Sequence, residues 1–268
     1  MSRVLIPSRG PSDWKGLLAD PEKHWRRGKS AFETAMSWEA AQATSRGLPP
    51  AIATLLDTQP ALAGATALVV LPEHKVKLAA PGRASQNDVW TLLRTGDALI
   101  SMSVEGKAGE TFGEPLDDWL KDASQGKRQR LESLCGLLGA ANPPDGRLRY
   151  QLFHRTASAL IEAERFGAVH AVMIAQSFLD DPVSLADYIA FGAALGVSVA
   201  KDQLTVVPRA AGPNLHLGWA SCMPASDSDV AAVVWTITSA RARPSGIVQM
   251  QCPTPRHSRG DCSAPPLP

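Results

Sequence analysis

Asp88, Glu105 and Lys107 are the residues of this chain whose types and spacing could form a reaction centre. Glu105 and Lys107 are two positions apart, so in a β-strand their side chains point to the same face. Two neighbouring carboxylates repel each other unless a cation neutralises them, and Mg²⁺ prefers such oxygen ligands. A lysine beside the cation can help to activate a bound water or stabilise a phosphoryl transition state. The plain alternative is a surface hairpin with a charged end, since Glu-x-Lys alone is a common pattern.

A tight β-hairpin is the element that would bring the two acids together. Residues 88–94 and 98–104 are rich in β-branched and apolar residues, and the short polar break between them contains a glycine, which is typical of a hairpin turn. If Gly96 and Asp97 are the two turn residues, residue 95 faces residue 98 and the pairing continues until Asp88 faces Glu105. We therefore expect both carboxylates and the lysine ammonium group at the open end of the hairpin.

These residues resemble the motif of the PD-(D/E)XK phosphodiesterase superfamily, which includes many restriction endonucleases and repair nucleases. In that superfamily an Asp opens the second core strand, and Asp or Glu, any residue and then Lys close the third. Asp88 matches the first position and Glu105-Gly106-Lys107 the second, whereas Asn87 stands where the pattern has Pro. The likeness covers about residues 30–177 and is closer to bacterial members without an assigned substrate.

The resemblance implies an α/β fold with a restriction endonuclease-like core, in which helices flank a central mixed β-sheet. It implies a metal-dependent nuclease that binds Mg²⁺ or Mn²⁺ through Asp88, Glu105 and the backbone carbonyl of Gly106, with Lys107 orienting or activating the attacking water. Nucleic acid, with DNA as the first expectation, would be the partner, and many nucleases of this fold work as homodimers. Some members have lost catalysis, so a non-catalytic binding module that retains the fold is the alternative.

Two further acids are candidate ligands of the same metal. The superfamily often offers an acid from the helix before the first core strand, which here would contain Glu33. However, Ser30 and Glu33 also have the spacing of a helix capping box, which favours a capping role for Glu33. Glu110 follows the second hairpin strand closely, where it could bind the metal or a water, or be an ordinary loop residue.

A long helix expected over residues 150–166 carries three more candidates. Gln151 and Arg155 lie four positions apart and therefore share one face, with His154 adjacent. In the superfamily this helix packs across the sheet, so all three side chains could position a phosphate or a water. The alternative is that they are solvated residues of a helix surface.

The composition limits the class of protein. The formal net charge is +1, with 44% hydrophobic and 20% charged residues, which are globular values. Residues 241–268 contain four Arg and one Asp, so the preceding part holds 23 basic and 25 acidic residues and lacks the basic excess of a protein built to grip long duplexes. No secretory signal and no apolar run of about 18 residues is present, so we expect a cytoplasmic protein without a membrane partner.

The chain is expected to form one domain followed by a tail. We predict a single domain over residues 1–222 and a largely disordered tail over 223–268, because residues 241–268 are rich in Pro, Ser and Arg and lack hydrophobic periodicity. The tail contains Cys252 and Cys262, whose spacing fits no common zinc module.

Apolar runs on both sides of the hairpin predict the rest of the sheet. Residues 66–71 predict a first core strand that ends at Pro72, and residues 168–175 predict a strand buried on both faces. Two further strands are expected over 200–207 and 214–221, where they would extend the edge of the sheet.

Overall fold

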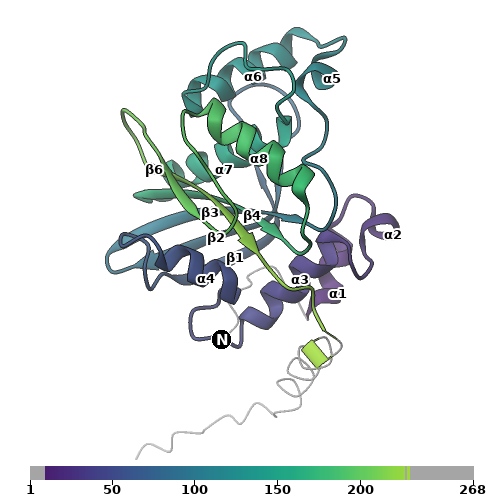
Figure 1. The fold of residues 1–268 in the computed structure, drawn as a ribbon, viewed down its shortest axis with the longest axis vertical. Helices are drawn as coiled ribbons and strands as arrows, with labels where there is room; N and C mark the ends of the chain where they lie inside the picture. The colour runs from purple at the N-terminus through teal and green to yellow at the C-terminus, as the bar shows by residue number, and fades with distance from the viewer. Residues whose placement is uncertain (1–9, 227, 230–268) are drawn as a thin grey trace, which may run out of the picture.

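A computed structural model of the chain describes residues 10–226 and 228–229. Within this part, one six-stranded sheet lies between two layers of helices (Figure 1). The strand order across the sheet is β1-β2-β3-β4-β6-β5. The strands are β1 (Thr66–Val76), β2 (Ser85–Thr95), β3 (Ala98–Lys107), β4 (His170–Ser177), β5 (Leu204–Val207) and β6 (Asn214–Ser221).

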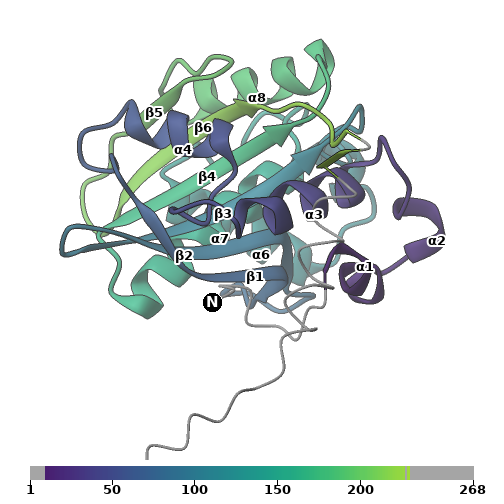
Figure 2. The ribbon, with the colours of Figure 1, turned by 90° about the horizontal axis from the view of Figure 1, so that it is seen from below.

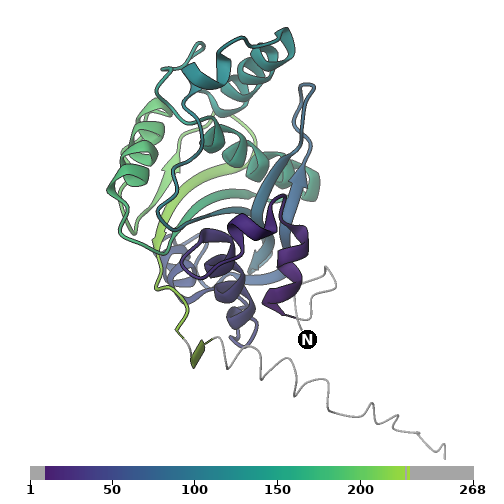
Figure 3. The same ribbon diagram turned by 90° about the vertical axis from the view of Figure 1, so that its right-hand side faces the viewer.

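The helices divide into an early group and a later group that cover opposite faces of the sheet (Figures 1 and 2). The early group contains α1 (Pro11–Trp14), the 3₁₀ helix η1 (Lys15–Leu17), α2 (Pro21–His24), α3 (Ser30–Ala41) and α4 (Pro50–Asp57). The later group contains α5 (Leu116–Leu120), α6 (Gln125–Leu138), α7 (Tyr150–Phe166) and α8 (Pro182–Ala194). The side view in Figure 3 shows the curved sheet between these two groups.

The sheet is mixed, as predicted. The pairs β1–β2, β2–β3 and β5–β6 are antiparallel, whereas β3–β4 and β4–β6 are parallel. The chain returns from β3 to β4 through α5, α6 and α7, because parallel neighbours need a long crossover connection. The predicted α/β architecture with helices on both faces is therefore confirmed, and β5 and β6 extend the sheet as expected.

The central strand β4 shows why both faces need helices. Alternate residues of β4 belong to two separate cores: Ala171, Met173 and Ala175 pack with the later helices, and Val172 and Ile174 pack with the early helices. This alternation follows from the two-residue period of a strand. The near-continuous apolar sequence of β4 is thus explained by burial on both faces, as predicted.

Two local predictions were wrong. Pro72 does not end the first strand, since β1 continues through it to Val76. Strand β1 is the edge strand of the sheet, where a missing proline N–H breaks no ladder on the open side. The capping box is also absent: Ser30 is already inside α3, whose N-cap residue is Lys29, and no side chain caps it at that position.

The described residues beyond position 222 remain in contact with the domain. The backbone N–H of Ala225 donates to Glu33 Oε2 at 2.8 Å, and Arg27 Nη2 donates to the Ala225 carbonyl at 2.7 Å. Most of the predicted tail, including Cys252 and Cys262, lies outside the described residues. No helix in residues 10–226 and 228–229 is long and apolar enough to cross a bilayer.

Candidate active site

The β2–β3 hairpin brings Asp88 and Glu105 level with each other. Its pairing runs from Thr95↔Ala98 to Val89↔Val104, which confirms the predicted turn at Gly96-Asp97. Gly96 has φ 53°, a left-handed conformation that glycine adopts without the cost of a Cβ. Because the register places Val89 opposite Val104, the next residues outward on the two strands are Asp88 and Glu105.

Glu105 is held by donors from three side chains. Its Oε1 accepts from Lys107 Nζ at 2.9 Å and from Gln151 Nε2 at 2.6 Å, and its Oε2 accepts from Arg155 Nε. Lys107 Nζ also donates to Gln151 Oε1 at 3.1 Å. Glu105 is 3% exposed and Arg155 is 7% exposed, so these charges attract each other in a largely water-free environment.

The ion pairs decide the protonation state of Glu105. Burial alone would raise the pKa of this carboxyl, but the positive charges of Arg155 and Lys107 together hold its pKa below the usual value. In turn, Glu105 and Asp88 outweigh the effect of burial and raise the pKa of Arg155. Glu105 and Arg155 are therefore both charged at neutral pH.

Asp88 has much less compensation. Its Oδ2 accepts from the backbone N–H of Gly106 at 2.8 Å, and no other described residue donates a hydrogen bond to it. Burial and repulsion from Glu105 raise the pKa of Asp88 to about 7, despite the opposing charges of Arg155 and Lys107. The cluster is thus short of positive charge at Asp88.

The close approach of β3 to α3 depends on Gly106. A Cβ on Gly106 would lie 2.1 Å from Thr34 Oγ1 and 3.4 Å from Asp88 Oδ2. The Thr34 hydroxyl is itself buried and has no hydrogen-bond partner among the described residues. The middle residue of the Glu-x-Lys motif therefore leaves space beside Asp88 into which an unpaired oxygen points.

The structure adds Glu73, which the sequence did not single out as a site residue. On β1, Pro72 pairs with Val89 and His74 pairs with Asn87, so Glu73 is level with Asp88. Burial, followed by repulsion from Asp88, raises the pKa of Glu73 to about 8, although Gln86 Nε2 donates to its Oε2 at 2.7 Å. The expected strand end at Pro72 concealed this residue, because an acid after a strand end looks like a loop residue.

His154 lies one contact away from the acids. Its Nδ1 is 2.8 Å from Ser85 Oγ and 3.3 Å from Arg155 Nη1, and Arg155 Nη1 also donates to Ser85 Oγ at 3.2 Å. Burial and the positive charges of Arg155, Arg130 and Lys107 lower the pKa of His154 well below its ordinary value, so the ring is neutral. Of the three candidates on α7, Gln151 and Arg155 contact Glu105, and His154 supports Arg155.

The carboxylates of Glu33 and Glu110 bind backbone N–H groups instead of joining this cluster. Glu33 is 1% exposed, and its two oxygens accept from Gly28 N and Ala225 N. Glu110 accepts from Ala108 N at 2.8 Å and from Ser30 N at 3.4 Å, so it stabilises the first turn of α3. Both acids thus have structural contacts: Glu33 accepts from Gly28 just before α3, and Glu110, a candidate metal or water ligand from the sequence, accepts from Ser30 at the first residue of the helix.

The donor set allows a limited test of the predicted metal. No group of three or more His, Cys, Asp or Glu side chains arranged to hold a metal ion occurs in the part of the chain that the structure describes. Both oxygens of Glu105 already accept protein hydrogen bonds, whereas Asp88 Oδ1 accepts none from the described residues. Among the carboxylate oxygens of Asp88 and Glu105, Asp88 Oδ1 is thus the one that no described donor occupies, and a metal held here would need waters or substrate oxygens as further ligands.

Comparisons with known proteins identify a family without assigning an activity. Residues 7–223 match the family described as a domain of unknown function, DUF6946. No curated protein and no solved structure matches the chain. The matched residues span both helical layers and the whole sheet, so the match covers the entire described domain.

Proposed function

This chain belongs to the DUF6946 family, and from its acidic cluster we propose that it is a metal-dependent nuclease that hydrolyses phosphodiester bonds. The observation that carries the proposal is the convergence of Asp88, Glu105 and Lys107 at one end of the hairpin, with Asp88 short of positive charge. The resemblance of these residues to the PD-(D/E)XK motif supports a restriction endonuclease-like core. DNA is the first substrate to test.

Asp88, Glu105 and the backbone carbonyl of Gly106 would hold Mg²⁺ or Mn²⁺. The metal would supply a Lewis acid for the phosphoryl oxygens and lower the pKa of a bound water. Burial, and then repulsion from Glu105, raises the pKa of Asp88 to about 7 despite the charges of Arg155 and Lys107, so a further cation beside Asp88 would stabilise its charged form. The oxygen-only donors and the unpaired Thr34 hydroxyl are consistent with such an ion.

Lys107 would orient the attacking water and stabilise developing negative charge. An ammonium group has three donors, and Lys107 uses two of them on Glu105 and Gln151. Its Nζ lies 4.7 Å from the centroid of the Phe112 ring, whose face attracts an ammonium group. Gln151 and Arg155 fix the position of Glu105 and thereby of Lys107, so they are positioning residues.

A non-catalytic binding module is the second candidate. It is favoured by the engagement of both Glu105 oxygens with protein donors and by the shortage of metal-binding side chains in the described residues. In such a module the cluster would only stabilise the hairpin against α7. Calorimetry with Mg²⁺ and Mn²⁺ separates the candidates, because the binding module does not require a metal.

A cleavage assay tests the proposed catalysis directly. Wild-type protein with Mg²⁺ or Mn²⁺ should cut single-stranded DNA, double-stranded DNA or RNA, and chelation should stop the reaction. Lys107→Ala should reduce the rate by at least about 100-fold, the usual scale for loss of a group that acts on the transition state. Lys121→Ala, an exposed lysine after α5, is the matched control and should cut normally.

Metal binding by wild type without cleavage of any substrate would refute the nuclease proposal. Cleavage that persists in Lys107→Ala would refute the role given to this lysine. Melting curves of both variants verify that the fold is intact, since Lys107 is buried and its loss also removes contacts.

A further inference from the structure

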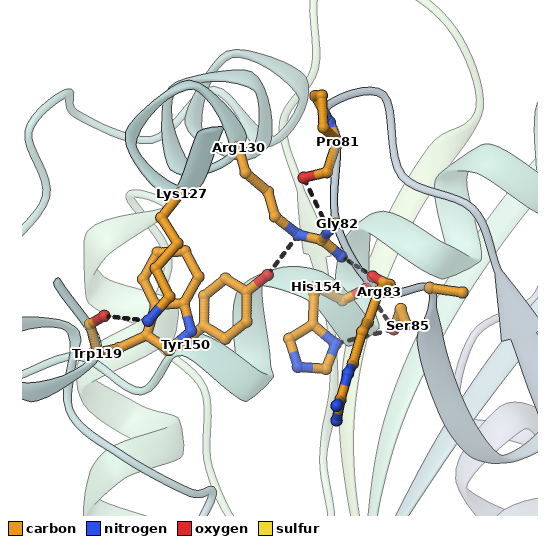
Figure 4. A pocket seen from close by; sticks show the side chains of 10 residues that line it. Pro81, Gly82, Arg83, Ser85, Trp119, Lys127, Arg130, Tyr150 and His154 are labelled. Atoms are coloured by element: carbon orange, nitrogen blue, oxygen red, sulfur yellow. Dashed lines mark hydrogen bonds between the residues drawn. The ribbon is translucent and has the colours of Figure 1, made fainter. Parts of the chain in front are cut away.

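A second polar site lies behind the acidic cluster, in a pocket of about 310 Å³. Figure 4 shows Arg130 above the rings of Tyr150 and His154, with Arg83 on the far side of His154. The loop before β2 and the helices α6 and α7 supply these side chains. The volume is at the lower end of the range of roughly 300–1,000 Å³ typical of small-ligand pockets.

Arg130 is a buried cation whose partners are all neutral. It is 7% exposed, and its Nε donates to Tyr150 Oη at 2.7 Å. Its Nη1 donates to the Pro81 carbonyl at 3.4 Å, and its Nη2 donates to the Arg83 carbonyl. No described carboxylate forms an ion pair with it. Because a buried charge is costly without an opposite charge, Arg130 favours an anion in this pocket.

Two further cations line the same pocket, and none of its lining residues is acidic. Lys127 Nζ lies 5.1 Å from the Trp119 ring centroid and donates to the Trp119 carbonyl at 3.0 Å, which leaves donors free. The Arg83 side chain forms no hydrogen bond or ion pair with any described residue. Together with Arg130, these side chains place three positive charges around one pocket, which favours an anionic ligand such as a phosphate group.

Aromatic rings adjoin the cations. Trp119 and Tyr150 stack with centroids 3.9 Å apart and an interplanar angle of 12°, and the His154 ring is 4.8 Å from Tyr150. Because His154 is neutral, its ring offers a flat face without adding charge. Cationic side chains beside aromatic rings match the two parts of a nucleotide, since phosphate binds the cations and a base packs against the ring surface that the Trp119–Tyr150 stack leaves uncovered.

Ser85 and His154 connect this pocket to the acidic cluster. Both residues line the pocket, and both contact Arg155 Nη1, whose guanidinium is paired with Glu105. A ligand in the pocket is therefore separated from the proposed reaction centre by a single layer of side chains.

We propose that the pocket binds one nucleotide unit of a single-stranded nucleic acid, with its phosphate on Arg83, Lys127 and Arg130 and its base against the Tyr150 and His154 rings. This inference rests on the proposed function, because it names the substrate of the same site. The pocket volume of about 310 Å³ is small for anything larger than one nucleotide unit, so we expect single strands or unpaired ends to bind in preference to continuous duplex.

Binding experiments in the presence of a chelator test the pocket without any metal or cleavage. A labelled single-stranded oligonucleotide is titrated with wild type, Arg83→Ala and Lys127→Ala, and its anisotropy is measured at several salt concentrations. Each variant should bind about five- to tenfold more weakly, and its slope of log K against log salt should fall by about 0.7, the change expected for one lost phosphate contact. Arg128→Ala removes an exposed cation of the same helix that does not line the pocket, and it should change neither quantity.

Calorimetry with a free nucleoside monophosphate and with inorganic phosphate distinguishes the source of the anion. The inference is supported if wild type binds the nucleotide and both pocket variants bind it more weakly. If wild type binds inorganic phosphate as tightly as the nucleotide, the base contributes nothing and the base-binding part of the inference is overturned. The inference also fails if the single-stranded oligonucleotide binds wild type and both variants equally, and a duplex binds wild type just as tightly. It fails as well if wild type does not bind the single strand at all. Arg130 is left intact, because its three neutral contacts make it a structural residue as well.

The inference and the catalytic proposal can fail separately. If oligonucleotide binding weakens in Arg83→Ala and Lys127→Ala but no substrate is cleaved by wild type, the pocket inference stands and the nuclease proposal is refuted. Cleavage that depends on Lys107, combined with unchanged binding and rates in Arg83→Ala and Lys127→Ala, refutes the pocket inference and leaves the nuclease standing.

Discussion

Replacing Asp88 by Asn should stabilise the folded protein at alkaline pH. Burial and the Glu105 carboxylate raise the pKa of Asp88 from 3.8 to about 7, so the folded protein holds a proton that the unfolded chain has already released. The stability contributed by this group therefore falls as the pH rises from 3.8 to about 7, and the full cost is present above that range. At about 1.4 kcal/mol per pKa unit, this cost is about 4 kcal/mol.

The Asp88→Asn change would remove the charge and retain an oxygen that can accept from the Gly106 N–H. The free energy of unfolding of this variant near pH 8.5 should therefore exceed that of wild type by about 2–4 kcal/mol. The range extends down to about 2 kcal/mol because Glu73 and Asp88 repel each other. Their raised pKa values are therefore not independent, and part of the electrostatic cost belongs to Glu73. Near pH 4 the two proteins should agree within about 0.5 kcal/mol, since Asp88 is protonated in the folded wild type.

Urea denaturation followed by circular dichroism at several pH values measures this difference. Asp97→Asn, an exposed acid in the turn of the same hairpin, is the matched control and should change the free energy of unfolding by less than about 0.5 kcal/mol. Added Mg²⁺ should raise the stability of wild type more than that of Asp88→Asn, because ligand binding to the folded state stabilises it. Equal stability of wild type and Asp88→Asn near pH 8.5 would refute the electrostatic account of the cluster.

The hairpin end supports two more predictions. Glu105→Gln should lower the free energy of unfolding by about 3–5 kcal/mol, because it leaves the Arg155 guanidinium buried without its ion-pair partner; urea denaturation measures the loss. In the Glu105→Gln protein, the further change Arg155→Met should lower the free energy of unfolding by less than the same change does in wild type. Equal losses in the two backgrounds would contradict the pairing. Gly106→Ala should lower the melting temperature, because its Cβ would lie 2.1 Å from Thr34 Oγ1. A second change, Thr34→Ala, should recover part of that loss, whereas no recovery would place the strain elsewhere.

The sequence was sufficient for the elements with strong local signals. The two-residue turn at Gly96-Asp97 set the register of the hairpin, and register alone brought Asp88 level with Glu105. The bounds of α7, residues 150–166, followed from its hydrophobic pattern and from Gly167 after its last residue. The face shared by Gln151 and Arg155 then followed from helix geometry.

Other parts of the site depend on contacts between distant segments. Glu73 was missed because Pro72 normally interrupts a strand, and only the edge position of β1 makes it acceptable there. Thr34 has no local pattern that indicates its contact with Gly106. Arg130 resembles any basic residue in a helix, and its burial becomes visible only when the loop before β2 folds over it. The superfamily-level fold and the nuclease activity stay predictions.

The backbone contact between Ala225 and Glu33 determines where the protein can be shortened. An expression clone that stops at residue 222 would delete the N–H that Glu33 Oε2 accepts and the carbonyl that Arg27 contacts. Glu33 is 1% exposed, so its carboxylate would lose a partner that solvent replaces poorly. Crystallisation trials and nuclease assays on trimmed protein should therefore keep the chain at least through Asp229, the last described residue.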